Sequence, residues 1–345
     1  MRARRWAGLG MAIALTATLA ACANGDSAPA SSDEPDAQAE ASESFPVTIE
    51  HVYGETVIET QPERIATVAW ANHEVPLALG VVPVGMAKAT WGDDDNDGVL
   101  PWVEDKLEEL GAETPTLWDE TDGIDFEAVA DSAPDVILAS YSGLTRDEYD
   151  TLSKIAPVVA YPENAWATSY QDMIRMNAKA IGLAAEGDAL IEDLQAQVET
   201  AYAKYPALHD AAPVFAYFDA NDLSQIGYYP TRDTRPGFLH DLGVPVPTVM
   251  KELSAETTEF YDTVSSEEAG RFDDVGLFVT YGDDDTIIDQ LQADPLLSKI
   301  PAIAAGKVAV LKNSTPLAAS ANPSPLSTPW GVDDYFAVLA APLEQ

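Results

Sequence analysis

The sequence predicts an α/β protein of two lobes joined by a long rigid helical segment, with a ligand cleft between the lobes. From about Phe45 onward, short β-branched runs alternate with helical stretches, which is the pattern of α/β layers. The alternation stops at a long helical stretch, residues 169–205, and then starts again. The roughly 300 residues involved are enough to build two ordinary hydrophobic cores.

The first lobe is expected over residues 45–165. Its strands are buried apolar runs at 64–70, 81–86, 134–139 and 157–161. One helix is expected at 72–79, because Gly80 supplies a C-cap, and another at 145–155.

Linking helices are expected over residues 166–205, with interruptions at Gly182 and Gly187, and the second lobe over 206–345. The second lobe repeats the alternation, with strands at 214–218, 275–281 and 307–311 and helices at 237–242, 286–291 and 332–339. Both lobes are therefore Rossmann-like, and ligands of such sheets bind at the carboxyl ends of the strands. A long helical connector predicts a small opening angle.

The start of the chain has the three regions of a secretory signal. Arg2, Arg4 and Arg5 are followed by an apolar run, residues 6–21, which is shorter than the ~20 residues of a membrane span. Leu19-Ala20-Ala21-Cys22 resembles the lipobox of bacterial lipoproteins and contains the only cysteine of the chain. The resemblance implies a signal peptide over residues 1–22, lipidation of Cys22, and a lipid anchor at the outer face of the cytoplasmic membrane. A plain signal peptide with an incidental cysteine is the alternative.

Residues 23–44 are rich in Ala, Ser, Asp, Glu and Pro, and they predict a disordered tether. The formal net charge of the chain is −40, which argues against nucleic acid and anionic lipid surfaces as partners. Because Cys22 is the only cysteine, the folded part is expected to form no internal disulfide. We also expect the protein to be a monomer.

Several segments, in their order and spacing, resemble the iron-siderophore substrate-binding proteins of ABC importers. The resemblance is carried by residues 62–65, Trp70, 78–85, 124–127, 134–138, 152–159 and 264–267 and by the strand at Lys307. This is the helix-linked class that also binds cobalamin and haem. The resemblance implies a non-catalytic receptor that needs no cofactor, binds a ferric siderophore and delivers it to an ABC permease with its cytoplasmic ATPase.

The family docks on its permease through one glutamate in each lobe, and the matching positions are Glu127 and Glu267. Each begins a helix that precedes a strand, where the helix dipole favours an exposed carboxylate. An ordinary first-turn glutamate is the alternative in a chain this acidic.

A ferric siderophore is bulky and polar, so its cleft needs flat aromatic walls and a few convergent donors. Aromatic residues at strand ends or in loops are the candidates: Trp70, Trp91, Trp118, Tyr141, Tyr217 and Tyr261, with Tyr228 and Tyr229 in similar contexts. Trp166 and Trp330 are interpreted as helix packing. Each aromatic on its own is more often a core residue.

Arg232 and Arg235 share one loop, and their guanidinium groups can bind carboxylate, catecholate or hydroxamate oxygens. A salt bridge to a neighbouring acid such as Asp233 is the alternative. The four histidines are scattered without ligand spacing, although His73 and a tyrosine would suit a haem iron.

Residues 93–104 fit the calcium-loop template. Asp93, Asp95 and Asp97 alternate, Gly98 allows the sharp turn, and Glu104 holds the last ligand position. A structural calcium ion is one interpretation, and an acidic loop in an acidic protein is the other.

The leading hypothesis is therefore a solute receptor for a ferric siderophore. A haem or cobalamin receptor of the same fold is the nearest rival. A lipid-anchored enzyme or adhesin that reuses the fold is a rival of another class, because a fold does not fix a function. The sequence has no nucleophile elbow and no Walker loop.

Overall fold

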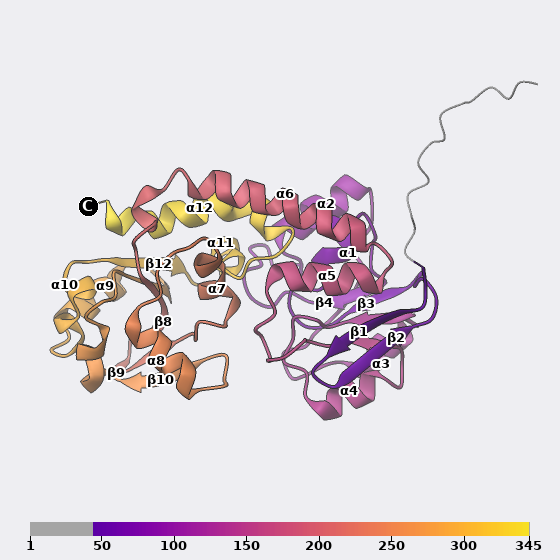
Figure 1. Cartoon of the computed structure of the whole chain (residues 1–345), viewed down its shortest axis with the longest axis horizontal. Helices are drawn as coiled ribbons and strands as arrows, with labels where there is room; N and C mark the ends of the chain where they lie inside the picture. Colours follow the sequence, from indigo (N-terminus) through magenta and orange to yellow (C-terminus); the bar gives the residue numbers. More distant parts are fainter. Residues whose placement is uncertain (1–43, 345) are drawn as a thin grey trace, which may run out of the picture. The chain divides into compact units, whose positions relative to one another are not determined.

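Two five-stranded sheets organise residues 44–344, the part of the chain that the computed structural model describes (Figure 1). The expected signal peptide with Cys22, and all but the last residue of the expected tether, lie outside the described residues. Within residues 44–344, no helix is both long enough and apolar enough to span a membrane.

The first sheet is entirely parallel, in the order β5-β4-β3-β6-β7. Its strands are β3 Ile65–Thr67, β4 Gly85–Ala87, β5 Thr116–Trp118, β6 Val136–Leu138 and β7 Val158–Val159. Its helices are α1 Glu74–Ala78, α2 Pro101–Leu110, α3 Phe126–Asp131 and α4 Arg146–Leu152. The strands are shorter than predicted, and Trp70 therefore lies in the loop after β3.

Local signals explain the ends of several of these helices. Gly80 follows α1 with a φ of 80°, as expected of a C-cap glycine. Thr145 begins α4 with a capping box, in which its hydroxyl accepts from the backbone of Glu148 while the Glu148 carboxylate accepts from Thr145.

An antiparallel hairpin that the sequence analysis missed precedes the first sheet. Its strands are β1 Val47–His51 and β2 Gly54–Ile58. Their apolar side chains pack with Val136, Leu138 and Val159 of the parallel sheet and with Ile181.

The long helical stretch consists of α5 Tyr170–Ala180 and α6 Ala184–Tyr202. Gly182 separates them with a φ of 77°, but the interruption predicted at Gly187 is wrong, because Gly187 lies inside α6. A Cβ at Gly187 would come within 2.5 Å of the Ala178 Cβ, so the glycine allows α5 and α6 to approach closely. Figure 1 shows α6 running beside α12, with which it is in contact.

The second sheet has the order β10-β9-β8-β11-β12. Its strands are β8 Pro213–Asp219, β9 Asp222–Tyr228, β10 Asp262–Ser265, β11 Leu277–Gly282 and β12 Val308–Lys312. β8, β11 and β12 are parallel, whereas β9 and β10 extend the sheet in antiparallel pairs. This lobe is therefore a mixed sheet, and the prediction lacked β9 and β10.

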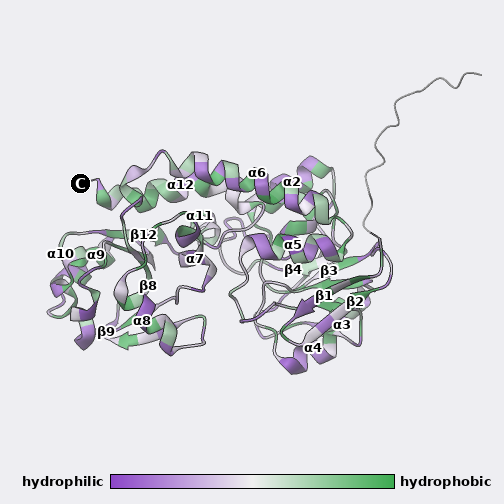
Figure 2. Cartoon of the chain, viewed as in Figure 1, coloured by the Kyte–Doolittle hydropathy of each residue, from purple (hydrophilic) through white to green (hydrophobic). Residues whose placement is uncertain are grey.

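Helices complete the second lobe. The α-helices are α7 Thr234–Asp241, α8 Thr248–Glu256, α9 Thr286–Ala293, α10 Pro301–Ala304, α11 Pro316–Ser320 and α12 Ser327–Ala340. Short 3₁₀ turns lie at η1 Pro206–Leu208, η2 Ser266–Phe272, η3 Leu297–Lys299 and η4 Ala341–Leu343. Figure 2 shows hydrophobic residues on the central strands and hydrophilic residues on outer helices such as α4.

A buried carboxylate joins the first lobe to the segment between α11 and α12. Glu74, on α1, accepts from the Ser324 hydroxyl and, at 3.1 Å, from the backbone N–H of Leu326. It also accepts from the indole N–H of Trp102 at 2.9 Å. Burial raises the pKa of Glu74 to about 7, although these hydrogen bonds oppose the rise.

Candidate ligand-binding site

A cavity of about 520 Å³ is lined by residues of both lobes. Its size lies within the range of about 300–1,000 Å³ that is typical of small-molecule sites. Its lining is mostly aromatic: Trp70, Trp91 and Tyr141 from the first lobe, Trp166 from the linking segment, and Tyr217, Tyr229, Arg235, Phe260, Tyr281, Asn313, Ala319 and Asn322 from the second lobe.

Strand ends position four of these side chains. Trp70 follows β3, Tyr141 follows β6, Tyr229 follows β9 and Asn313 follows β12. The prediction that the site lies where strands end is therefore consistent with the cavity.

Edge-to-face pairs hold the aromatic walls. Trp91 of the first lobe meets Tyr281 of the second at 5.5 Å between ring centroids and 85° between planes. Tyr141 and Trp166 meet at 5.5 Å and 77°. Such pairs are a favoured geometry for aromatic rings and keep their faces in place.

Hydrogen bonds of Asn322, which lines the cavity, also connect the lobes. Asn322 donates from Nδ2 to the Tyr141 hydroxyl at 2.9 Å, and Thr234 donates to Oδ1 of Asn322 at 2.5 Å. Burial is the main cause that raises the pKa of Tyr141 to about 12, so the phenol is neutral at physiological pH.

Among the described residues that line this cavity, Arg235 is the only cation. It donates from Nε to Oδ1 of Asp233 at 2.8 Å and from Nη2 to Oδ2 at 2.7 Å, and the side chain of Asp233 is fully buried. Its guanidinium carbon lies 3.6 Å from the centroid of the Tyr229 ring. Because Asp233 already neutralises the guanidinium, the cavity carries little net charge.

Three predicted contact residues do not line the cavity. Trp118 is only 2 % exposed and packs over Gly85, where a Cβ would lie 2.1 Å from its ring. Arg232 donates to the carbonyls of Ser254, Thr257 and Glu259 at 2.6–3.1 Å, which orders the loop after α8. Tyr261 packs over Gly227 and makes an edge-to-face contact with Tyr229, which lines the cavity.

Other residues line the cavity although the sequence analysis missed them. Trp166 was interpreted as helix packing, but it precedes α5 with a φ of 58° and faces the cavity. Phe260 and Tyr281 were not singled out. Trp330 does pack against a neighbouring helix, at 5.2 Å from Trp102, and Tyr228 is buried.

A second cavity, of about 280 Å³, adjoins the first, and Trp70 and Trp166 line both. Its other lining residues belong to the first lobe, and the charged or titratable ones are His73, Lys88 and Glu120. Burial lowers the pKa of His73 to about 4, so its imidazole is neutral.

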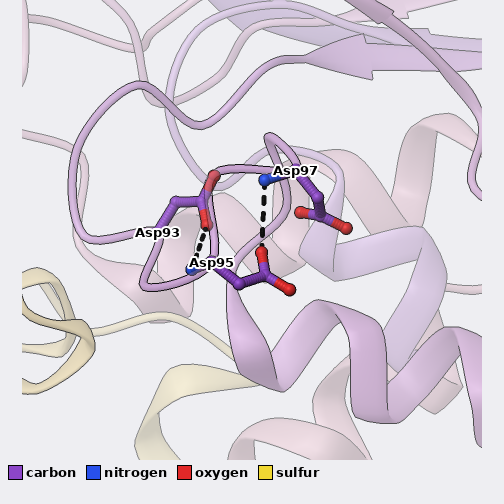
Figure 3. A group of neighbouring side chains, drawn as sticks. All are labelled: Asp93, Asp95 and Asp97. Atoms are coloured by element: carbon purple, nitrogen blue, oxygen red, sulfur yellow. Dashed lines mark hydrogen bonds between the residues drawn. The ribbon is translucent and has the colours of Figure 1, made fainter.

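The predicted calcium loop brings three carboxylates together (Figure 3). Asp93, Asp95 and Asp97 offer oxygens that all lie within 4.8 Å of one another. Asp93 accepts from the backbone N–H groups of Asn96 and Gly98 at 2.8 and 2.7 Å, and Gly98 has a φ of 94°.

Glu104 lies in the first turn of α2 and is not among the three grouped residues. Its pKa is raised to about 7, first by burial and then by the Asp97, Asp95 and Asp94 carboxylates. Calcium binding at this loop stays a prediction.

The two predicted docking residues are exposed. Glu127 lies in the first turn of α3, where Asp125 caps the helix. Glu267 lies in the first turn of η2, where Ser265 accepts from its backbone N–H. Neither carboxylate forms an ion pair within residues 44–344.

Comparisons with known proteins agree with this architecture. The chain is 30 % identical over 258 residues to the probable siderophore-binding lipoprotein YfiY of Bacillus subtilis, covering 72 % of this chain and 74 % of that one. It is 24 % identical over 283 residues to the Fe(3+) dicitrate-binding periplasmic protein FecB of Escherichia coli, covering 79 % and 85 %.

A solved structure resembles most of this chain. PiaA of Streptococcus pneumoniae, crystallised in complex with ferrichrome, is 44 % identical with a TM-score of 0.82, over 86 % of this chain and 98 % of that one. The model of the family described as "Periplasmic binding protein" matches residues 65–315. This chain therefore belongs to the periplasmic binding protein family.

Proposed function

We propose that this protein is a receptor that captures a ferric siderophore outside the cytoplasmic membrane and delivers it to an ABC importer. The observation that carries the proposal is the aromatic cavity between the lobes. Its walls match a bulky, flat-sided chelate, and its polar groups are few and already oriented. YfiY, FecB and PiaA, which this chain resembles, are named for siderophore, ferric dicitrate and ferrichrome binding.

The charge of the cavity favours an uncharged chelate of the ferric hydroxamate type. Arg235 is paired with Asp233 in two hydrogen bonds, so an anionic chelate would have to compete for the guanidinium. The net charge of −40 also repels anions at long range. A hydroxamate chelate such as ferrichrome needs only hydrogen-bond donors and aromatic contact.

The receptor captures its ligand by shifting the population from open to closed arrangements of the lobes. A chelate that touches both lobes stabilises the closed arrangement, because it contacts that arrangement more extensively. We propose no chemical step. The haem alternative has no support in the aromatic cavity, since His73 lines the second cavity and not the aromatic one.

Cys22 supplies the lipid anchor in this proposal, and residues 23–44 form the tether that lets the lobes reach the permease. Glu127 and Glu267 place one exposed carboxylate on each lobe for arginines of the permease. The protein acts as a monomer, and the partner ATPase supplies the energy for transport.

Calorimetric titration of the purified protein tests the proposed ligand. Ferrichrome is expected to bind at micromolar or lower concentration, and ferric citrate, a ferric catecholate, haemin and cobalamin are expected to bind more weakly. Trp70→Ala should weaken ferrichrome binding by about 10-fold or more, as loss of a buried aromatic contact does. Trp330→Ala is the matched control, because Trp330 is 39 % exposed and outside the cavity.

Tight binding of haemin alone would contradict the proposal. Equal effects of the two tryptophan substitutions would show that the chelate binds elsewhere.

A further inference from the structure

The second cavity contains a carboxylate whose charge is not balanced. Glu120 accepts at Oε2 from the backbone N–H of Ala69 at 2.9 Å. Its other oxygen, Oε1, is buried, and no group within residues 44–344 donates a hydrogen bond to it. No ion pair of Glu120 is formed in the same part of the chain.

The surroundings of Glu120 make this carboxylate costly to ionise. Burial raises its pKa to about 7, and the negative charge of Glu148 on α4 adds to the rise. A buried carboxylate is stabilised as an anion by hydrogen bonds or by a positive charge nearby. The cavity thus favours a cationic group beside Glu120.

The basic residues around the cavity do not supply that charge. Lys88 lines the cavity and its side chain packs over Gly98, but it forms no ion pair with Glu120 within residues 44–344. His73 is neutral, because burial lowers its pKa to about 4. Arg235 faces the other cavity and is paired with Asp233.

The position of the cavity connects it to the proposed ligand site. Trp70 and Trp166 line both cavities, so the two cavities are neighbours at these rings. The apolar part of the lining, which includes Met86, Val99 and Leu100, suits a short alkyl chain.

We propose that the second cavity binds the terminal primary ammonium of a linear ferric hydroxamate, with Glu120 as its counter-ion and the iron-bearing part in the aromatic cavity. This inference rests on the proposed function and adds to its ligands the ferric hydroxamates that carry a free amine. The ammonium supplies the positive charge that Glu120 lacks, and the alkyl arm packs along Trp70 and Trp166. The net charge of −40 attracts such a cationic complex at long range.

Paired ligands test the proposal without altering the protein. Ferrioxamine B, a linear ferric hydroxamate with a free amine, is titrated calorimetrically in parallel with its N-acetyl derivative, which lacks the charge. We expect the amine form to bind about 10- to 100-fold more tightly, as a charge-assisted hydrogen bond in a buried site gives. Ferrichrome, which has no amine, is the reference chelate.

Two neighbouring substitutions locate the effect. Glu120→Gln keeps an oxygen for the Ala69 N–H but removes the charge, and it should abolish the preference by weakening binding of the amine form alone. Asp119→Asn makes the same change of charge at the adjacent exposed residue and should preserve the preference.

The outcomes separate this inference from the proposed function. Equal affinity for the amine and N-acetyl forms, with ferrichrome still bound, would overturn the ammonium site alone. A preference that survives Glu120→Gln would also overturn it. Failure of all three chelates to bind would overturn the proposed function and this inference together.

Discussion

Replacing Asp233 by asparagine is expected to destabilise the protein by removing the charge that balances Arg235. Asparagine retains the shape of the side chain and its ability to cap α7, where Asp233 accepts from the backbone N–H of Arg235 at 3.0 Å. The change therefore isolates the ion pair. The side chain of Asp233 is fully buried and that of Arg235 is 14 % exposed, so water replaces little of the lost interaction.

The expected loss is about 3–5 kcal/mol, which is typical when one partner of a buried ion pair is removed. This is a large fraction of the free energy of unfolding of a natural domain, which is ~5–15 kcal/mol. Removing both charges, with Asp233→Asn and Arg235→Met together, should cost less than the sum of the two single changes, because neither charge is then left unpaired.

Chemical denaturation of the wild type, the two single variants and the double variant measures the coupling. Strict additivity of the two losses would refute the buried ion pair. The same variants test the ligand argument, since Asp233→Asn frees the guanidinium and should strengthen binding of an anionic chelate such as ferric citrate relative to ferrichrome. An unchanged ratio of the two affinities would contradict the claim that Asp233 keeps the cavity near neutral.

Three further perturbations follow from the structure. Burial raises the pKa of Glu74 to about 7 in the folded protein. The unfolded chain therefore loses this proton at a lower pH than the folded protein does. The free energy of unfolding consequently falls as the pH rises from the ordinary pKa of a glutamate to about 7. Between about pH 5 and about pH 8, the free energy of unfolding of Glu74→Gln should therefore rise by on the order of 3 kcal/mol relative to that of the wild type, as measured by denaturation. Calcium added after chelation should raise the Tm by about 5 °C at a hundredfold excess over its Kd, and Asp95→Asn should remove the effect. Glu127→Lys combined with Glu267→Lys should lower iron-chelate uptake by cells about tenfold or more, with no change in chelate affinity.

Each of these expectations has a contrary outcome. A pH-independent difference between wild type and Glu74→Gln would mean that this carboxyl stays ionised in the fold. An unchanged Tm with calcium would leave residues 93–104 as an acidic loop. Unimpaired uptake by the double lysine variant would exclude the two glutamates as docking residues.

The order of the elements was predictable where apolar runs are continuous. The runs around Ile65 and Val136 lie at the centre of the first sheet and the run around Val158 lies at its edge, and all three runs are buried. β9 was missed because Asp222–Tyr228 begins with polar residues and is exposed over its first half. The hairpin β1–β2 was missed because its alternating strands stabilise only when paired and packed on the sheet.

The candidate site was predictable only where it depends on chain position. Trp70, Tyr141 and Tyr217 were selected because they lie at or near strand ends, and they line the cavity. Arg232 and Arg235 were indistinguishable in sequence, since the choice depends on carbonyls after α8 that capture Arg232. Trp118 was misplaced because a three-residue strand, β5, carries it into the core.

The position of iron in crystals of the protein with a ferric hydroxamate tests the central claim most directly. An anomalous difference map at the iron absorption edge is expected to show one peak inside the aromatic cavity, between Trp70 of the first lobe and Tyr229 of the second. A peak at residues 93–104 or on the outer surface, with the aromatic cavity free of chelate, would contradict the assignment of the ligand site.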